Sequence, residues 1–514
     1  MTPREIAYAL RQIGDLLMLR GASRFQVRAY RQAADAVLDG IPGIGPATRA
    51  VVDELERTGT STLLERLRAD TPVGLLDVMR IPGMRLAQLR RLHEELGVDS
   101  LDSLEAAALD GRLAALPRIG PKTVERLLAG IATVRRMSGW MLASKAQVEA
   151  QRLLRAIIAH PSVQRAAIAG SLRRGADLVR DIDIVTVGAD DIAGSLSGPG
   201  LALDLYNVRP EGFATALWRA TGSGTHVEQA TKAGIAIDAD FASEEDLYAS
   251  IGLPFIEPEL REGMGEIDAA RLGRLPRLVT RADIQGVLHT HSTYSDGKAT
   301  IAELADGARA RGWRYIGISD HSEAAFYAGG LTRDAVRSQH DEIDRLNAAA
   351  HDGFRILKGI EADILPDGRI DYPPELLDQF DYVIGSIHSR FSMDRDAMTA
   401  RLLRALDDPH VTILGHPTGR LLLRREPYPV DLEAVMEKAA ARGVALEINA
   451  DPYRLDLNWH WAHVAKGLGA KLSIGPDAHS VAALDNVEAG IAIARKAWLE
   501  SSDLLVWPLD RRLQ

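Results

Sequence analysis

The stretch IQGVLHTHSTYSDG, residues 284–297, decides how the C-terminal part of this 514-residue chain folds. It begins as a short apolar run and ends that run in His289-Thr290-His291. Alternate residues of a β-strand point to the same side, so both imidazoles can reach one metal ion. Asp296 follows in a Ser-Asp-Gly segment, which is typical of a loop. The stretch therefore predicts a strand whose carboxyl end carries metal ligands.

Outward from this stretch, apolar runs alternate with helical stretches through residues 283–514. There are seven runs: Ile284–Leu288, Tyr315–Ser319, Phe354–Gly359, Tyr382–Ser386, Val411–Gly415, Val444–Ile448 and Lys471–Gly475. Such alternation predicts parallel strands with helical crossovers, most simply a closed β/α barrel. In barrels of this kind the functional residues gather at the carboxyl ends of the strands.

Every one of these runs has an ionisable or amide side chain at the same end. A lone histidine is more often a surface or core residue whose hydrogen bonds are made within the protein. A whole set of such side chains at equivalent strand ends indicates a metal centre. The set comprises His289, His291, Asp296, Asp320, His321, Glu361, His388, His416, Glu447, Asn449, Asp477 and His479. These donors suit Mn²⁺ or Zn²⁺. Ions about 3.5–4 Å apart activate water and stabilise both oxygens of an in-line phosphoryl displacement.

Composition narrows the possibilities. The chain has no cysteine, which excludes disulfides, zinc ribbons and thiol nucleophiles, and 11 of its 14 histidines lie after residue 282. It has neither an apolar run near 18 residues nor a signal-like start, so we expect a cytoplasmic protein without a membrane partner. Net charge is −10, yet residues 1–140 carry 20 Lys and Arg against 17 Asp and Glu. The slightly basic end of the chain is therefore the N-terminal one.

The metal-ligand pattern resembles the PHP domain, named after polymerase and histidinol phosphatase, and all nine ligands of that family have counterparts here. The resemblance implies that one ion is held by His289, His291, Glu361 and Asp477. A second ion would take Glu361, His388 and His479, and a third would take Asp296, His321 and His416. Val287 stands where the family usually has an aspartate before the first histidine. Three arginines in loops near the strand ends are candidates for binding substrate phosphate: Arg390, Arg420 and Arg454.

A second pattern lies upstream, where Gly170-Ser171-Leu172-Arg173-Arg174-Gly175 precedes Asp181-Ile182-Asp183. Carboxylates at positions i and i+2 of a strand face one side and can share a metal. The pattern resembles the nucleotidyltransferase palm of the DNA polymerase X family. That resemblance implies that Gly170, Ser171 and Arg174 hold a dNTP. It also implies that Asp181, Asp183 and Asp204 hold Mg²⁺ or Mn²⁺ for catalysis.

This palm departs from the family pattern in ways that predict weaker nucleotide binding. Only 20 residues separate Asp183 from Asp204, which predicts a reduced α+β palm with little more than a hairpin between the carboxylates. Arg180 replaces a glycine that lies close to the triphosphate in the family. Arg219 and Ala220 replace an aromatic pair that packs on the incoming sugar.

The N-terminal part repeats a Gly/Pro turn before helix-like stretches, at residues 41–46, 81–86 and 116–122. Glycines before a helix leave backbone N–H groups exposed, and these can hold a phosphate. The turns resemble helix-hairpin-helix units, which implies that Gly43, Gly45, Gly120 and Lys122 contact the DNA backbone. No lysine precedes Lys122, which argues against a Schiff-base lyase in this part.

Together the patterns predict a multidomain α/β protein that resembles bacterial family X DNA polymerase/3′–5′ exonucleases. The expected parts are a helical lyase-like DNA-binding domain (1–80), a helix-hairpin-helix region (81–140), a reduced palm (141–230), a thumb-like segment with linker (231–282) and a distorted (β/α)₇ PHP barrel (283–514). We expect a DNA repair enzyme acting on gapped or 3′-ended duplexes, as exonuclease, abasic endonuclease or 3′-phosphatase. Two alternatives remain: a small-molecule phosphatase of the histidinol-phosphate type, and a non-catalytic DNA-binding scaffold.

Overall fold

The computed structural model describes residues 3–39, 44–72, 74–189 and 202–505. The chain divides after Trp140 into two compact units, a helical N-terminal one and a larger C-terminal one. The five-part division expected from the sequence stays a prediction. Among the described residues, every helix is too short or too polar to cross a membrane.

The N-terminal unit is built of helices only. They are α1 (Pro3–Leu19), α2 (Arg24–Asp39), α3 (Pro46–Thr58), α4 (Thr62–Asp70), α5 (Leu75–Met79), α6 (Leu86–Leu96), α7 (Leu101–Leu109) and α8 (Pro121–Met137). In α1, the apolar residues Leu10, Ile13 and Leu16 recur every third position and are completely buried. Around this buried stripe the unit forms its own core, which reaches as far as Val134 of α8.

The three repeated turns each lead into a helix, as the sequence predicts. Gly45 and Gly120 are the N-cap residues of α3 and α8, and Arg85 is that of α6; none of the three caps its helix with a side chain. The first backbone N–H groups of these helices are therefore left to other acceptors. Lys122 lies exposed in the first turn of α8. Gly43 lies outside the described residues.

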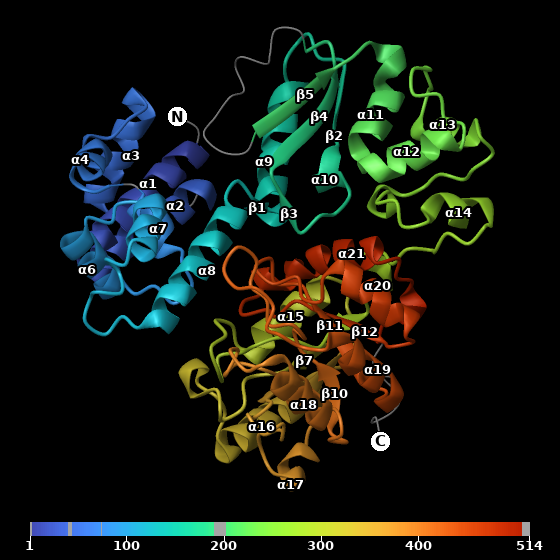
Figure 1. Cartoon of the computed structure of the whole chain (residues 1–514). Coiled ribbons are helices and arrows are strands. Elements are labelled where there is room, and N and C mark those ends of the chain that lie inside the picture. The colour runs from blue at the N-terminus through green and yellow to red at the C-terminus, as the bar shows by residue number, and fades with distance from the viewer. Residues whose placement is uncertain (1–2, 40–43, 73, 190–201, 506–514) are drawn as a thin grey trace. The chain divides into compact units, whose positions relative to one another are not determined.

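The second unit begins with a small mixed sheet. Strands β2 (Arg165–Ile168), β4 (Asp181–Val187) and β5 (Ala202–Asn207) pair in the order β2-β4-β5, with α9 (Ala143–Ile158) packed on them and α10 (Gly170–Arg173) between β2 and β4 (Figure 1). A two-stranded ribbon joins β1 (Met141–Leu142) to β3 (Leu178–Val179).

The expected hairpin between the palm carboxylates is wrong, because β4 and β5 run parallel. Parallel neighbours need a crossover that returns the chain to the starting end of the sheet. The register pairs Asp183 with Asp204, so both side chains project from the same face of the sheet. The reduced palm thus keeps its carboxylates together through strand register.

Short helices follow the palm sheet: η1 (Pro210–Gly212), α11 (Phe213–Thr221), α12 (Gly224–Lys232), α13 (Glu244–Ala249), η2 (Pro258–Leu260), α14 (Glu266–Arg271) and η3 (Arg281–Asp283). Their core surrounds Trp218 and Tyr248, which are both fully buried and joined by a 3.0 Å hydrogen bond. Arg261 is also fully buried and pairs with Glu244.

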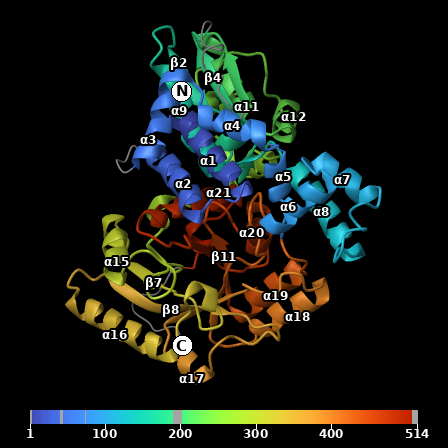
Figure 2. The same cartoon turned by 90° about the vertical axis from the view of Figure 1, so that its left-hand side faces the viewer.

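The sequence-predicted barrel is confirmed. Seven parallel strands pair in chain order: β6 (Gly286–Val287), β7 (Tyr315–Ile318), β8 (Arg355–Asp363), β9 (Tyr382–Ser386), β10 (Val411–Leu414), β11 (Ala445–Asn449) and β12 (Leu472–Gly475). The outer layer consists of α15 (Ile301–Ala310), α16 (Arg333–Ala349), α17 (Pro374–Leu377), α18 (Arg395–Ala405), α19 (Leu432–Arg442), α20 (Trp459–Gly467) and α21 (Val487–Lys496). These helices lie around the strands in both views (Figure 1 and Figure 2).

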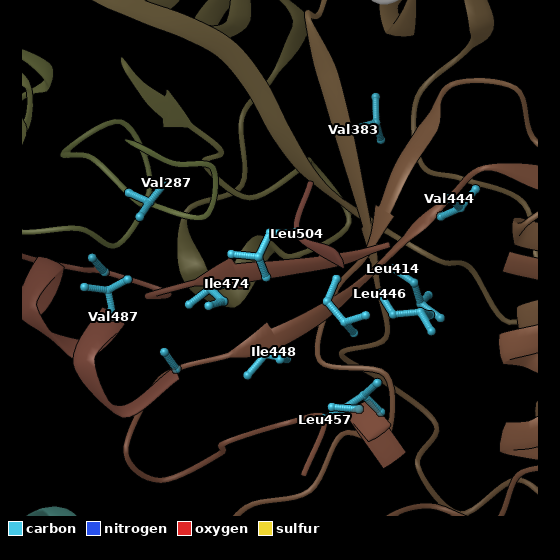
Figure 3. Close-up of a cluster of buried hydrophobic side chains, with 14 of the residues drawn as sticks. Val287, Val383, Leu414, Val444, Leu446, Ile448, Leu457, Ile474, Val487 and Leu504 are labelled. Atoms are coloured by element: carbon cyan, nitrogen blue, oxygen red, sulfur yellow. The ribbon is translucent and has the colours of Figure 1, made fainter. Parts of the chain in front are cut away.

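The barrel closes differently at its two ends. At the carboxyl end, Thr290 bridges Ala478 in parallel, which joins the segments that follow β6 and β12. Nearer the amino end, Leu504 bridges Leu472, so the C-terminal segment lies against β12. Figure 3 shows the side chains of Ile474 and Leu504 close together within the apolar core that also holds Val287. The tight closure therefore lies at the end where the polar side chains gather.

Candidate metal centre and palm site

Glu361, on β8, is the central carboxylate of the barrel's polar end. His416 Nε2 lies 3.0 Å from its Oε1, and His388 Nε2 lies 3.2 Å from the same oxygen. His321 Nδ1 lies 2.9 Å from its Oε2, and His289 Nε2 lies 3.4 Å from Oε1. Burial raises the pKa of Glu361, but the surrounding histidines outweigh it and hold the pKa well below its usual range. The carboxylate is thus an anion in a cluster of imidazoles.

The ligand atoms fall into three groups, and within each group all of them lie within 4.8 Å of one another. The groups are His289, His291 and Asp477; then His321, Glu361 and His388; then His291, Asp296, His321 and His479. Three groups match the number of ions that the resemblance to the PHP domain implies.

Two histidines stand elsewhere than the resemblance implied. His479 Nε2 lies 3.3 Å from Asp296 Oδ1, so it belongs beside Asp296 and not with His388. His416 lies against Glu361, and its ring centroid is 5.1 Å from that of His388. Strand order is the reason, because β10 neighbours β9 whereas the end of β12 closes against the end of β6. The expected grouping was wrong in exchanging His416 and His479.

The donor set fits divalent ions, because several of its buried atoms have no other partner. Among the described residues, no hydrogen bond reaches Nε2 of His289, either ring nitrogen of His291, or Oε2 of Glu361. A buried polar atom left unpaired costs about 1–3 kcal/mol. Coordination of a cation would satisfy these atoms together.

Outer carboxylates orient the ligand histidines. Glu447, on β11, lies with Oε1 2.6 Å from His289 Nδ1, and Asp363 lies with Oδ1 2.7 Å from His388 Nδ1. A side chain at Gly475 would place its Cβ 2.1 Å from Glu447 Oε1, so only glycine leaves room for this contact. Glu447 therefore supplies the carboxylate behind the first histidine, a place for which Val287 has no polar group.

The three candidate arginines differ in their surroundings. Arg454 is close to the centre, with Nε 3.5 Å from Asp477 Oδ2. Arg420 is largely buried, pairs at 3.0 Å with Asp177, which lies just before β3, and donates to the carbonyl oxygens of Arg454 and Leu455. Arg390 is exposed in a left-handed backbone conformation, and within the described part of the chain no side chain pairs with it. Arg390 and Arg454 are thus better placed than Arg420 to reach a substrate.

The palm carboxylates also come together. Asp183 lies between Asp181 on its own strand and Asp204 on the neighbouring one. Burial and the charge of Asp181 raise the pKa of Asp183 to about 6, which is the behaviour of a carboxylate cluster that favours a cation. Gly170 has φ of +67°, and a Cβ there would lie 1.8 Å from Asp183 Oδ2. The glycine is therefore required for the turn and for the close approach of the aspartate.

Arg174 is tied to the neighbouring helices. Its Nε donates to Glu262 Oε1 at 2.7 Å, and its Nη1 donates to the carbonyl of Thr221 at 2.8 Å. Glu262 also pairs with Lys496 of α21, which is 2% exposed and donates to the carbonyl of Arg174. Ser171 is half-buried in α10. A chain of charges thus joins the palm's arginine to the last helix of the barrel.

Comparison with known proteins agrees with this geometry. The model of the PHP domain matches residues 288–451, and the model of the SAM-like helix-hairpin-helix tandem matches residues 75–133. The DNA polymerase/3′-5′ exonuclease PolX of Bacillus subtilis is 34% identical, and the match covers 98% of this chain and 97% of that protein. The chain belongs to this family.

Other relatives match a smaller share of the chain. Probable phosphatases of Caldanaerobacter subterraneus and Shewanella oneidensis are each 32% identical, over 39% and 44% of this chain and 78% and 85% of their own. A solved structure of histidinol phosphate phosphatase from Lactococcus lactis, complexed with zinc, L-histidinol and phosphate, matches 41% of this chain and 93% of its own. Its identity is 22% and its TM-score 0.33.

Sequence reasoning assigned no role to several side chains of this family X protein's two sites. Asp363 follows Glu361 by two positions on β8, and that spacing alone could have flagged it. Asp320 accepts hydrogen bonds from Ser292 and Gln339, behind His321. Tyr206 lies two positions after Asp204, and its hydroxyl donates to Asp183 Oδ1 at 3.1 Å. The hydrogen bonds of Asp320 and Tyr206 join segments that are distant in the sequence, so only the fold reveals these two contacts.

Proposed function

We propose that this chain is a DNA repair enzyme whose PHP domain shortens DNA from 3′ ends as a metal-dependent phosphoesterase. One observation carries the proposal: eight ligand side chains gather in three groups and His416 lies against Glu361, in a chain related to PolX over nearly its whole length. Phosphodiester cleavage is the chemistry that clustered divalent ions favour, because they polarise phosphoryl oxygens and lower the pKa of water.

The protein's own side chains bind and orient in this scheme. Glu447 and Asp363 hold His289 and His388 in the ring orientation that points the second nitrogen of each into the centre. Arg454, beside Asp477, would receive a non-bridging phosphate oxygen, and exposed Arg390 would meet a phosphate further along the strand. Arg420, held by Asp177, would support the loop that presents Arg454.

The imidazole-rich donor set suits Mn²⁺ or Zn²⁺ as the three ions of the PHP centre. All the proposed ligands are nitrogen or carboxylate oxygen, since the chain has no thiolate to offer. Metal analysis of the protein purified without added metal should find close to three such ions per chain. A single ion would contradict the three-group assignment.

For the palm we propose weak gap filling with Mg²⁺ or Mn²⁺ held by Asp181, Asp183 and Asp204. Gly170, Ser171 and Arg174 would hold the dNTP triphosphate. Two features limit the activity: Arg174 is engaged by Glu262, and Arg219-Ala220 offers no aromatic ring to the incoming sugar. The triphosphate must compete with Glu262 for the guanidinium.

The helix-hairpin-helix turns would hold the backbone of a gapped or 3′-ended duplex. The uncapped N-termini of α3 and α8 support this role, with Gly45 and Gly120 giving a phosphate access to the backbone N–H groups. Lys122 adds a positive charge at the second of them. Contacts of this kind fix the position of the protein on the DNA without reading the base sequence.

The test is a 5′-labelled primer in a one-nucleotide-gapped duplex with Mn²⁺, resolved on a sequencing gel with and without dNTPs. We expect shortening without dNTPs that is lost in His289→Ala and kept in Asp183→Ala. Extension by one nucleotide with dNTPs should be lost in Asp183→Ala. If DNA stays intact while a small phosphate ester is hydrolysed, the phosphatase alternative replaces the proposal.

A further inference from the structure

An exposed aromatic pair, Phe326 and Tyr327, forms the tip of the short loop that follows His321. Their side chains are 84% and 62% exposed, and their ring centroids lie 5.9 Å apart in an edge-to-face arrangement. Of the large apolar side chains that the described residues expose, these two alone are neighbours in the chain. Single exposed apolar residues are common on proteins, but an adjacent pair at the edge of a functional site calls for a role.

The loop under this aromatic tip is firmly anchored. Leu331 donates its backbone N–H to the carbonyl of His321 at 2.8 Å, which brings the loop back to the point where it left the barrel. Gly330 donates to Ala325, and a Cβ at Gly330 would lie 1.9 Å from the carbonyl oxygen of Ser322. The rings are therefore presented by a fixed turn, which lowers the entropy cost of using them as a contact surface.

The aromatic tip lies beside the metal centre. The loop begins one residue after His321, and a Cβ at Gly329 would lie 3.5 Å from the carbonyl oxygen of Ser295, the neighbour of Asp296. Burial raises the pKa of the Tyr327 hydroxyl, and the charges of Asp363 and Glu361 raise it further. The charge of Arg454 lowers the pKa of the same hydroxyl. The ring, the two carboxylates and this arginine therefore lie near one another.

We infer that Phe326 and Tyr327 form a stacking platform for the nucleobase of the 3′-terminal nucleotide, next to the phosphate that the metal centre attacks. A π-face accepts any base, which suits an exonuclease that must proceed through every sequence. The cationic groups hold the phosphate while the rings hold the base. This inference rests on the proposed nuclease function and specifies what the site recognises: a base-bearing DNA end.

The experiment compares two single-stranded oligonucleotides with Mn²⁺ and the full-length enzyme. One ends in a normal 3′ thymidine, and the other ends in an abasic tetrahydrofuran residue. The wild type should cleave the base-bearing end with a KM lower by roughly 5- to 100-fold, the range that base–aromatic stacking gives. In the Phe326→Ala/Tyr327→Ala double variant the two substrates should have equal KM values.

Two conservative variants and one control sharpen this comparison. Tyr327→Phe and Phe326→Trp keep a ring and should keep the preference. Leu272→Ala removes an apolar side chain that is also 62% exposed in the same compact unit, so it should change neither KM. If the double variant keeps the wild-type ratio of KM values, the stacking platform is refuted.

A binding measurement gives a second readout independent of turnover. An oligonucleotide with 2-aminopurine as its 3′ base, joined by a phosphorothioate that slows cleavage, should lose fluorescence on binding the wild type because the base stacks. The loss should vanish in the double variant. If the wild type shortens neither oligonucleotide nor the primer in the gapped duplex, the proposed nuclease function fails. If it shortens only the primer in the gapped duplex, the stacking platform fails. If it shortens both oligonucleotides with equal KM and without quenching, only the stacking platform fails.

Discussion

The PHP centre and the palm site both gather carboxylates from parallel strands, with histidines added in the PHP centre, yet they are built differently. In the PHP centre the ligands come from the carboxyl ends of six strands, and Glu361 at the middle is 1% exposed. In the palm, Asp183 is half-buried, Asp204 is exposed on an edge strand, and Arg174, which we propose for the triphosphate, is paired with Glu262. One site is formed in advance, and the other must rearrange its charges to bind its substrate.

The difference teaches where each site gets its rigidity. Seven strands and a closed carboxyl end hold the PHP ligands, and outer carboxylates such as Glu447 fix their ring orientations. Preorganised ligands need no reorganisation during reaction, which favours catalysis. The palm relies on three strands and on ion pairs to the barrel's last helix. We therefore expect nuclease activity to depend on single ligands, and the palm to depend on a charge network.

The largest effect should come from Glu361→Gln, which keeps the size of the side chain and removes its charge. Four histidines lie within 3.4 Å of this carboxylate, so we expect loss of bound metal from the centre. Metal ions contribute several kcal/mol to phosphoryl chemistry, so nuclease kcat/KM should fall on the order of 1,000-fold or more. Metal analysis and the primer-shortening rate measure the two effects.

The matched change in the palm is Asp183→Asn. It removes the central palm carboxylate. The nuclease rate should stay within about twofold of the wild type, because substitutions at distant sites act independently of one another. Extension with dNTPs should disappear. A nuclease defect in Asp183→Asn comparable with that of Glu361→Gln would show that the two sites do not act separately.

Glu447→Gln should produce the next largest effect. Glu447 accepts from His289 Nδ1 and from the backbone N–H of His416, so it orients two histidines without reaching a substrate. Loss of an outer-shell partner typically costs 10- to 100-fold in metal affinity or activity, and we expect about that loss here. Activity titrated against free Mn²⁺ should recover at higher concentration, unlike that of Glu361→Gln. Failure to recover would mean that Glu447 does more than orient ligands.

The barrel and its ligands could be predicted because each strand encodes its own contribution locally. His289-Thr290-His291 and Asp477-Ala478-His479 carry their chemistry within three residues of a strand end. A parallel barrel then brings these ends together whatever the loop lengths. The grouping of His416 and His479 could not be read this way, because it depends on which strands are neighbours and where the barrel closes.

The palm was harder to predict because its contacts are set by register and by distant partners. The spacing from Asp183 to Asp204 suggested a hairpin, but strand direction is decided by the crossover and by packing, not by the number of intervening residues. Nothing near Arg174 in the sequence announces Glu262 or Lys496, which are 88 and 322 residues away. Such long-range ion pairs appear only once the helices are packed.

Lys496→Met tests the charge network that distinguishes the palm. Lys496 is 2% exposed, burial lowers its pKa, and it pairs with Glu262, which then holds Arg174. Methionine fills a similar volume but leaves Glu262 with one cationic partner fewer. A buried charged group that loses a hydrogen-bond partner costs about 1–3 kcal/mol, so urea-induced unfolding should show that decrease. The KM for dNTP should also change, because Arg174 loses its fixed position.

The control for this variant is Lys438→Met on the outer surface of the barrel. Lys438 pairs with Asp407 at 2.6 Å but is 28% exposed, so water screens the pair. The free energy of unfolding should change by less than about 0.5 kcal/mol. Equal losses for Lys496→Met and Lys438→Met would show that the buried network adds nothing particular to the palm.

The smallest expected effect is a pH dependence that comes from Glu244, which joins Arg173 next to the palm turn to buried Arg261. Burial raises the pKa of Glu244, but Arg173 and Arg261 outweigh it and hold the pKa below its usual range. A group whose pKa is lower in the folded state adds stability above its unfolded pKa of about 4.3 and loses it as the pH falls through the folded pKa. The contribution of Glu244 should therefore be full at pH 7 and decline in acid.

Glu244→Gln isolates this contribution, because glutamine cannot titrate and every other group is unchanged. At pH 7 the variant should unfold at lower urea than the wild type, since Arg173 and Arg261 lose their anionic partner. As the pH falls below about 4.3, wild-type Glu244 approaches protonation and the difference between the two proteins should shrink. Metal loss in acid affects both proteins alike and cancels in the difference. A gap that stays constant with pH would mean that the shape of Glu244, and not its charge, holds the two arginines beside the palm.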